Sequence, residues 1–168
     1  MGVKVSVKGN LGLDKLIDTA KGYDGKKIRV GYWNQGELEM IAGVHEFGVE
    51  IRVTPKMRAW FAYQGYPLKP TTTSVKIPER SFLRAGFDAN ERWFTNHVGD
   101  MLQDAFESEL PSETILNMFA LEFKGKIQEY MRDLKSPALS DMTIERSGRS
   151  NPLVDSGQMV GKIRSEVE

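Results

Sequence analysis

The stretch "ERWFTNHVGDMLQDAFESEL-P-SETILNMFALEFKGKIQEYMRDL", residues 91–134, decides the fold because it predicts two long helices joined at a proline. In each half, apolar residues recur every three or four positions and so form one stripe. Pro111 ends the first helix, since the residue before a proline avoids the helical conformation. Ser112 can cap the second helix. Two helices with apolar faces and a short connection predict an antiparallel pair.

Short strands and shorter helices are predicted on both sides of this pair. Alternating apolar and polar residues predict the strands, and apolar stripes predict the helices. The strands are expected at 3–8, 27–33, 49–54, 71–77 and 161–167, and the helices at 11–20 and 37–47. The sequence therefore predicts an α+β fold: a small, mainly antiparallel sheet with helices packed on one face, an extended β-hairpin and a long antiparallel helix pair.

The length of 168 residues predicts a single domain spanning 1–168. Within it, residues 51–78 are expected to form a protruding β-hairpin. Residues 136–168 are expected to form a polar C-terminal excursion followed by a closing strand. In the short helix 37–47, the expected core face is Leu38, Ile41 and Val44 or His45.

The middle of the hairpin, residues 55–70, is rich in aromatic and basic side chains. A connection of this length is usually functional or disordered. Exposed aromatic side chains beside cations make a docking surface, whereas the alternative is that they fold back onto the core. The candidate contact residues here are Arg58, Trp60, Phe61, Tyr63 and Tyr66.

Composition excludes several classes of protein. The chain has 23 basic and 23 acidic residues, and this balance argues against a generic nucleic-acid binder. The absence of cysteine excludes disulfides, thiolate chemistry and Cys-ligated zinc. No apolar run is long enough to cross a bilayer, and the amino terminus does not resemble a signal peptide. We therefore expect a protein that is made in a cytoplasm and does not contact a membrane.

Charge is distributed in blocks along the chain. Residues 51–92 carry eight basic and three acidic side chains, whereas residues 93–122 carry six acidic and no basic ones. Blocks of opposite charge suit head-to-tail contact between identical subunits. The alternative is that the two surfaces are solvated separately.

Candidate catalytic and metal-binding residues are few. His45 and Glu46 are adjacent, so on a helix their side chains diverge and cannot share a metal as residues at i and i+4 can. His97 has no His or Cys at helical spacing. We therefore expect both histidines to be structural, and we expect no cofactor, no metal and no catalytic residue.

The triplet Asp155-Ser156-Gly157 follows two apolar residues, which is the local pattern of an aspartic-peptidase active site. Only 11 residues follow Gly157, and the preceding sequence is rich in helical patterns, unlike that nearly all-β fold. Asp and Ser bond to their own backbone in turns, and Gly accepts a positive φ. We interpret the triplet as a turn that directs the last strand, and keep the peptidase as an alternative.

Three fragments together resemble a known family, the tail-completion or neck proteins of long-tailed bacteriophages, also described as virion morphogenesis or head–tail joining proteins. They are "VHEFG" (44–48), "IPERSFLRAGFDANE" (77–91) and "TIERSGRSNPLVDSGQM" (143–159). The resemblance covers residues 27–168. Glu79 and Ser81 depart from the family, whose members often carry Ala and Pro there.

The resemblance implies a structural protein without catalytic residues. It implies a ring of identical subunits, a hexamer, that touches a head connector or adaptor on one side and a tail terminator or tail-tube protein on the other. DNA would pass through the lumen without sequence-specific contact. The protein would lie in the virion neck, after assembly in the host cytoplasm.

The family motifs contain residues that we expect to be structural and two arginines that are candidates for an interface, with a structural role within the subunit as the stronger alternative. The structural set is His45, Glu46, Phe47, Gly48, Pro78, Phe82, Leu83, Asp155 and Gly157. Arg80 and Arg84, at i and i+4, are expected to share a helical face and to meet acidic helices of the same or a neighbouring subunit. The alternative function is a phage-encoded nucleic-acid-binding factor that uses the basic aromatic hairpin.

Overall fold

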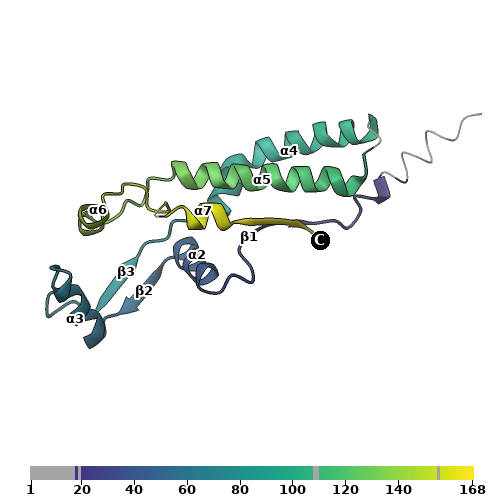
Figure 1. Cartoon of the computed structure of the whole chain (residues 1–168). Helices are drawn as coiled ribbons and strands as arrows, with labels where there is room; N and C mark the ends of the chain where they lie inside the picture. The colour runs from purple at the N-terminus through teal and green to yellow at the C-terminus, as the bar shows by residue number, and fades with distance from the viewer. Residues whose placement is uncertain (1–17, 19, 108–109, 155) are drawn as a thin grey trace, which may run out of the picture. The chain divides into compact units, whose positions relative to one another are not determined.

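The computed structural model describes residues 18, 20–107, 110–154 and 156–168, and in this part of the chain the fold is α+β, as predicted (Figure 1). The expected strand 3–8 and nearly all of the expected helix 11–20 lie outside the described residues. The elements are β1 (Ile28–Gly31), α2 (Glu37–Phe47), β2 (Val49–Arg52), α3 (Pro55–Tyr63), β3 (Ser74–Ile77), α4 (Arg84–Glu107), α5 (Ser112–Asp133), α6 (Asp141–Ser147), α7 (Gln158–Lys162) and β4 (Arg164–Val167).

The described strands form two separate two-stranded sheets, β1 with β4 and β2 with β3. In the second sheet the strands are antiparallel, with Val49 opposite Ile77 and Arg52 opposite Ser74. Beside the first sheet, Lys27 and Glu168 exchange both backbone hydrogen bonds, at 2.9 and 2.8 Å. This exchange is the pattern of an antiparallel pair. The closing strand predicted at 161–167 is present at Arg164–Val167, but its first two residues belong to a helix that the sequence did not predict, α7.

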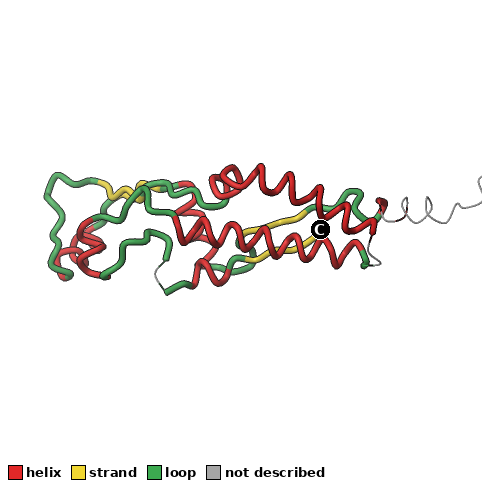
Figure 2. The backbone as a smooth tube through the Cα atoms, turned by 90° about the horizontal axis from the view of Figure 1, so that it is seen from above, coloured by secondary structure: helices red, strands yellow, loops and turns green. Residues whose placement is uncertain are grey.

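The described contacts group into two compact units. The first unit comprises described residues within 18–30, 91–123 and 165–168, and the second comprises residues 31–90 and 124–164. Both long helices contribute to each unit, and α4 and α5 run side by side in Figure 1 and again in Figure 2. The expectation of a single domain over 1–168 stays a prediction.

The core of the first unit comes from the apolar stripes of the helix pair. The Phe94 ring meets Phe119 and Phe123 edge-on, with centroids 6.5 and 4.2 Å away. The stripes predicted from the sequence are therefore the buried faces of α4 and α5. The buried apolar residues of this part are Phe94, Ala105, Ile115, Leu116, Phe119 and Ala120.

The core of the second unit lies where the start of α4 meets the end of α5. Phe82, Ile127 and Met131 are its most completely buried large side chains. Gly86 permits this contact, because a Cβ there would lie 3.1 Å from Ile127 Cδ1. The Gln128 amide donates to the Val160 carbonyl at 2.7 Å and so holds α7 against α5.

Three sequence predictions need correction. The first long helix begins at Arg84, one to two turns earlier than the apolar stripe suggests. The centre of the hairpin contains the helix α3, which the aromatic composition did not predict. In α2 the expected face of Leu38, Ile41, Val44 and His45 is only half-buried, and the most buried residues are Ala42 and Glu46, because the contacts of this helix bury a carboxylate.

Candidate functional site

The first two family-like fragments meet in the second unit, and the third lies across a cavity from the first. The Arg80 backbone N–H donates to the His45 carbonyl at 2.7 Å, which joins the first fragment to the second. The Arg80 side chain donates to the carbonyls of Pro137 and Ala138, at 2.7 and 2.8 Å. These carbonyls belong to the segment that leads into the third fragment. Residues more than 90 positions apart thus form one polar junction.

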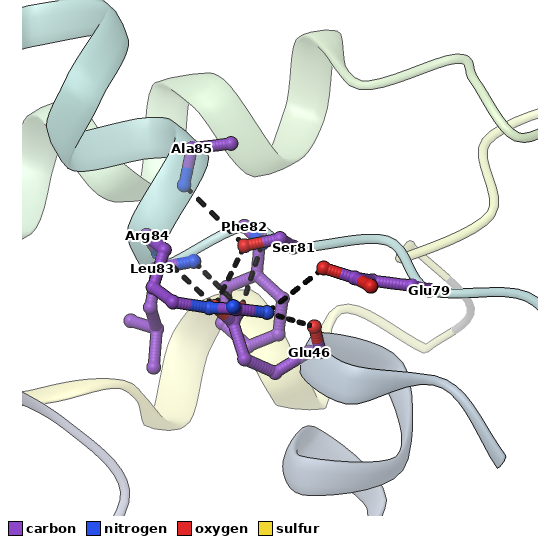
Figure 3. A network of polar contacts seen from close by, with 7 residues as sticks. All are labelled: Glu46, Glu79, Ser81, Phe82, Leu83, Arg84 and Ala85. Atoms are coloured by element: carbon purple, nitrogen blue, oxygen red, sulfur yellow. Dashed lines mark hydrogen bonds and ion pairs between the residues drawn. The ribbon is translucent and has the colours of Figure 1, made fainter.

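Glu46, in the last turn of α2, is the centre of this junction (Figure 3). Its carboxylate accepts hydrogen bonds from the backbone N–H groups of Phe82, Leu83 and Arg84, at 2.8, 2.9 and 3.1 Å. The Ser81 hydroxyl donates to it at 2.8 Å. The first amides of a helix lack partners within it, and they carry the positive end of its dipole. Glu46 therefore caps α4 from a different helix.

The polar neighbours of Glu46 keep it charged although it is buried, with 3% of the residue exposed. Burial alone would raise the pKa of the carboxyl, but hydrogen bonds from Leu83, Ser81 and Arg84 outweigh burial and lower it below its ordinary value. The Arg84 guanidinium adds a contact of 3.0 Å between Nε and the carboxylate, and a second of 2.9 Å to Glu79. The site is therefore a satisfied ion pair rather than a proton donor.

Acid should remove the stabilisation that Glu46 provides. Its folded pKa lies below the ordinary 4.5. The contribution of the carboxylate is therefore fully present above that ordinary value and is lost as the pH falls through the folded pKa. Glu46→Gln cannot titrate, so its free energy of unfolding should fall less between pH ~5 and ~2 than that of the unmodified chain. Urea unfolding at a series of pH values measures this. An equal fall in the free energy of unfolding for Glu46→Gln and the unmodified chain would contradict the prediction.

Gly48 lets the chain turn from α2 into β2 against the second fragment. Its φ is +68°, and a Cβ there would lie 2.7 Å from the Glu79 backbone nitrogen and 3.1 Å from the Ile77 carbonyl oxygen. The preceding Phe47 side chain is exposed, and the Arg84 guanidinium lies 4.8 Å from its ring centroid. The motif "VHEFG" thus combines a capping carboxylate with a glycine. The positive φ and the close approach of the Glu79 backbone both require a residue without a side chain at this glycine.

The prediction that Arg80 and Arg84 share a helical face is wrong. Arg80 precedes α4, is 5% exposed, and directs its guanidinium to backbone carbonyls within the unit. Burial also lowers the pKa of that guanidinium. Arg84 begins α4, and its side chain is about half exposed. Phe82 is fully buried, as expected, while Leu83 and Pro78 are half-buried.

The third fragment is fixed to the end of α5 by Asn151. Its amide donates to the Arg132 carbonyl at 2.6 Å, and its side-chain oxygen accepts from the backbone N–H groups of Leu153 and Val154. Leu153 is buried, as expected for an apolar plug. Gly157 has a φ of +78° just before α7, which fits a turn. Asp155 lies outside the described residues.

A cavity of about 290 Å³ lies between the first and third fragments. Burial first, and then the Arg80 charge, lower the pKa of His45, so its imidazole is neutral near pH 7. Among the described residues, the buried His45 Nδ1 has no hydrogen-bond partner. The lining residues are Leu38, Ile41, His45, Leu139, Arg149, Asn151, Pro152, Leu153, Ser156, Gln158 and Met159.

The hairpin tip, residues 55–70, is an ordered structure built on α3. Thr54 caps α3 by accepting from the Met57 N–H at 3.2 Å, and Pro55 occupies a position where no N–H is needed. The Arg58 guanidinium donates to three carbonyls of the returning segment, those of Leu68, Lys69 and Thr72. In Figure 1 the β2–β3 ribbon carries α3 at its end.

The aromatic side chains of the tip do not all fold back onto the core. Tyr63 is 87% exposed and Trp60 is 45% exposed, while Phe61 and Tyr66 are half-buried. Helix α6 supports the tip, because the Tyr66 hydroxyl donates to Glu145 at 3.0 Å and the Arg146 guanidinium lies 5.6 Å from the Trp60 ring centroid. The sequence left open whether this surface is presented to solvent, and the structure presents it.

The chain is an α+β protein in which the fragments 44–48 and 77–91 contact each other through Glu46 and Arg80. Searches against protein-family models, curated proteins and solved structures find no match for this chain. Across the described ranges, no cluster of three or more His, Asp or Glu side chains is arranged to bind a metal. No helix in those ranges combines the length and the apolar character that a membrane span needs.

Sequence reasoning included Glu46 among the structural residues but missed its role as a cap. The local sequence gave no sign of this role, because Ser81, just before α4, can itself accept from a helical N–H, as it does from Ala85 at 3.4 Å. The spacing of 36 positions between Glu46 and Phe82 hides this relation from any local pattern. The order of the tip was missed as well, although Thr54-Pro55 is a helix-start signal.

Proposed function

We propose that this chain is a structural protein of the phage neck, which forms a ring that joins the head connector to the tail. The observation that carries the proposal is the junction of the first two family-like fragments around Glu46 and Arg80, where Arg80 also holds the segment that leads into the third fragment. Each fragment is weak alone as a signature of a family. The contacts between the first two, and the cavity that the first shares with the third, give a physical reason why the three would occur together in one sequence.

The roles of these residues support a structural function. Glu46 caps a helix, Gly48 allows a close backbone approach, and Arg80 fixes a distant segment by its carbonyls. Such contacts hold α2, α4 and the C-terminal excursion in one arrangement. A ring subunit needs that rigidity, because it must present two different partners with fixed surfaces.

A ring of identical subunits, with six as the number that the resemblance implies, needs a heterologous contact that closes on itself. The chain carries an exposed aromatic tip in one unit and an acidic helix segment in the other. These surfaces are different from each other, as a head-to-tail contact requires. DNA would pass through the lumen and meet the ring without base-specific contacts.

A second candidate function is a nucleic-acid-binding factor that uses the tip. The exposed Tyr63 and the exposed Lys56 and Lys69 favour it, because aromatic and basic groups together bind single strands. The net charge of zero opposes it. Salt-dependent retention on a DNA column, lost in Lys56→Glu, would favour this function over the neck protein.

Deletion of the gene from the phage genome that carries it tests the main proposal. If the chain joins heads to tails, lysates of the deleted phage should contain DNA-filled heads and separate tails, which electron microscopy distinguishes. Supplying the chain from a plasmid should restore joined virions. Normal virions from the deleted phage would overturn the proposal.

A further inference from the structure

The tip of the second unit is a basic and aromatic surface. Residues 55–70 contain three basic side chains and no acidic one. Arg58 is used within the tip, whereas Lys56 and Lys69 are exposed. The exposed Tyr63 and Trp60 add apolar area beside these cations. Aromatic anchors with neighbouring cations are the composition that dominates binding energy at protein interfaces.

The first unit contains a surface of opposite character, which we call the acidic groove. It is a cavity of about 240 Å³ between the end of α4 and the start of α5. Phe119 and Ile115 form a buried apolar floor, and Met118 is 54% exposed at the side. The residues lining the groove are His97, Asp100, Met101, Asp104, Leu110, Ile115, Met118, Phe119 and Glu122.

The rim of the groove has an excess of negative charge. Asp100 and Asp104 lie at i and i+4 on α4, where like charges repel each other. Glu122 is paired with His97 across the groove. Residues 93–122 include no Lys or Arg, so this segment supplies no cation of its own to the two aspartates. A cation from another molecule would relieve the repulsion.

We propose that the tip of one copy docks into the acidic groove of a second copy, with Tyr63 or Trp60 on the apolar floor and Lys56 and Lys69 beside Asp100 and Asp104. The inference rests on the proposed function, because this contact is the one that would build the ring. The two surfaces match in apolar character and are opposite in charge. Since they are different surfaces, each copy can use both, and the contact is head-to-tail.

Cysteine cross-linking tests this contact directly, since the chain has no cysteine. Tyr63→Cys and Met118→Cys should each stay unlinked alone and should form a mixed disulfide dimer when the two proteins are combined under oxidising conditions at low salt. The matched control replaces Tyr63→Cys by Met40→Cys, whose residue is 62% exposed on α2. The tip pair should link at least about tenfold more than the control pair.

Two outcomes would overturn the inference. One is a mixed dimer no more abundant than the control at the highest soluble concentration. The other is a disulfide formed within single molecules of the doubly substituted chain while the two single variants do not link, which would place the tip and groove contact inside one chain.

Charge reversal gives an independent readout with exposed residues that do not support the fold. Lys56→Glu with Lys69→Glu should weaken the cross-linking on the order of tenfold, and Asp100→Lys with Asp104→Lys should do the same. Combining the tip variant that carries Lys56→Glu and Lys69→Glu with the groove variant that carries Asp100→Lys and Asp104→Lys should restore the cross-linking. Equal cross-linking in all combinations would overturn the pairing of charges.

These results are separate from the test of the proposed function. If the cysteine pair did not cross-link but electron microscopy showed rings, the proposed contact between tip and groove would be wrong. The proposed neck function would still hold. If the cysteine pair cross-linked specifically but gene deletion left normal virions, the contact between tip and groove would hold. The proposed neck function would then be wrong.

Discussion

Glu46→Ala is expected to lower the free energy of unfolding by about 3 kcal/mol, which corresponds to a fall in Tm of about 6 to 12 °C. The substitution removes the acceptor for the backbone N–H groups of Phe82, Leu83 and Arg84 and for the Ser81 hydroxyl. Loss of a helix cap costs about 1 kcal/mol, and buried donors without partners cost about 1–3 kcal/mol more. Urea unfolding followed by circular dichroism measures the change.

Two control variants separate the cap from other effects. Glu46→Gln keeps one acceptor oxygen, so its loss should lie between those of the unmodified chain and of the alanine variant. Glu37→Ala removes an exposed carboxylate from the first turn of the same helix and should cost no more than about 0.5–1 kcal/mol. If Glu46→Ala were as mild as Glu37→Ala, the capping role would be wrong.

Gly48→Ala is expected to destabilise the chain by about 3 kcal/mol as well, for a different reason. At a φ of +68° an alanine is strained, and its Cβ would meet the Glu79 backbone nitrogen at 2.7 Å. Strain of this kind costs about 1–3 kcal/mol, and the backbone just after β3, at Glu79, would have to move to relieve the contact. Thermal unfolding measures the loss.

Gly43→Ala is the matched control, since it lies inside α2, only five positions before Gly48, the residue that follows this helix. Its added Cβ would meet no described atom within 4 Å, and alanine favours a helix. That variant should be about 0.5–1 kcal/mol more stable than the unmodified chain. We expect the two glycine-to-alanine changes, one inside α2 and one just after it, to have opposite signs, and a loss of similar size in both would contradict the role given to Gly48.

The helix pair and the paired strands were predictable because each depends on local periodicity. The apolar stripes around Phe94 and Phe119 recur at helical spacing and are buried where they were expected. The strands β2 and β3 pair in the order that a hairpin requires. The fold class follows from such patterns without knowledge of distant contacts.

The helix in the tip and the true start of α4 were not predictable from apolar periodicity. The α3 sequence has aromatic and basic residues and no buried face, so its stability comes from Thr54, Pro55 and the Arg58 contacts. The first turn of α4 is fixed by a carboxylate from another helix rather than by its own sequence. The Thr54-Pro55 start of α3 is a local signal, whereas the carboxylate that fixes α4 lies 36 positions before Phe82 and is not visible in any local pattern.

The candidate site was predictable in part. The family-like fragments identified Glu46, Gly48 and Phe82 as structural residues, and each makes a structural contact. The same reasoning placed Arg80 at an interface on a shared face with Arg84. That arrangement is wrong because Arg80 precedes the helix and is buried against carbonyls whose positions depend on the folded C-terminal segment.

Cryo-electron microscopy of the virions that we propose to contain this chain tests the central claim most directly. The account predicts a closed ring of identical copies between the head connector and the tail tube, into which this fold can be fitted. It also predicts that the chain is present in purified virions by mass spectrometry. Complete virions that lack the chain, or a neck ring built entirely from other proteins, would contradict the account.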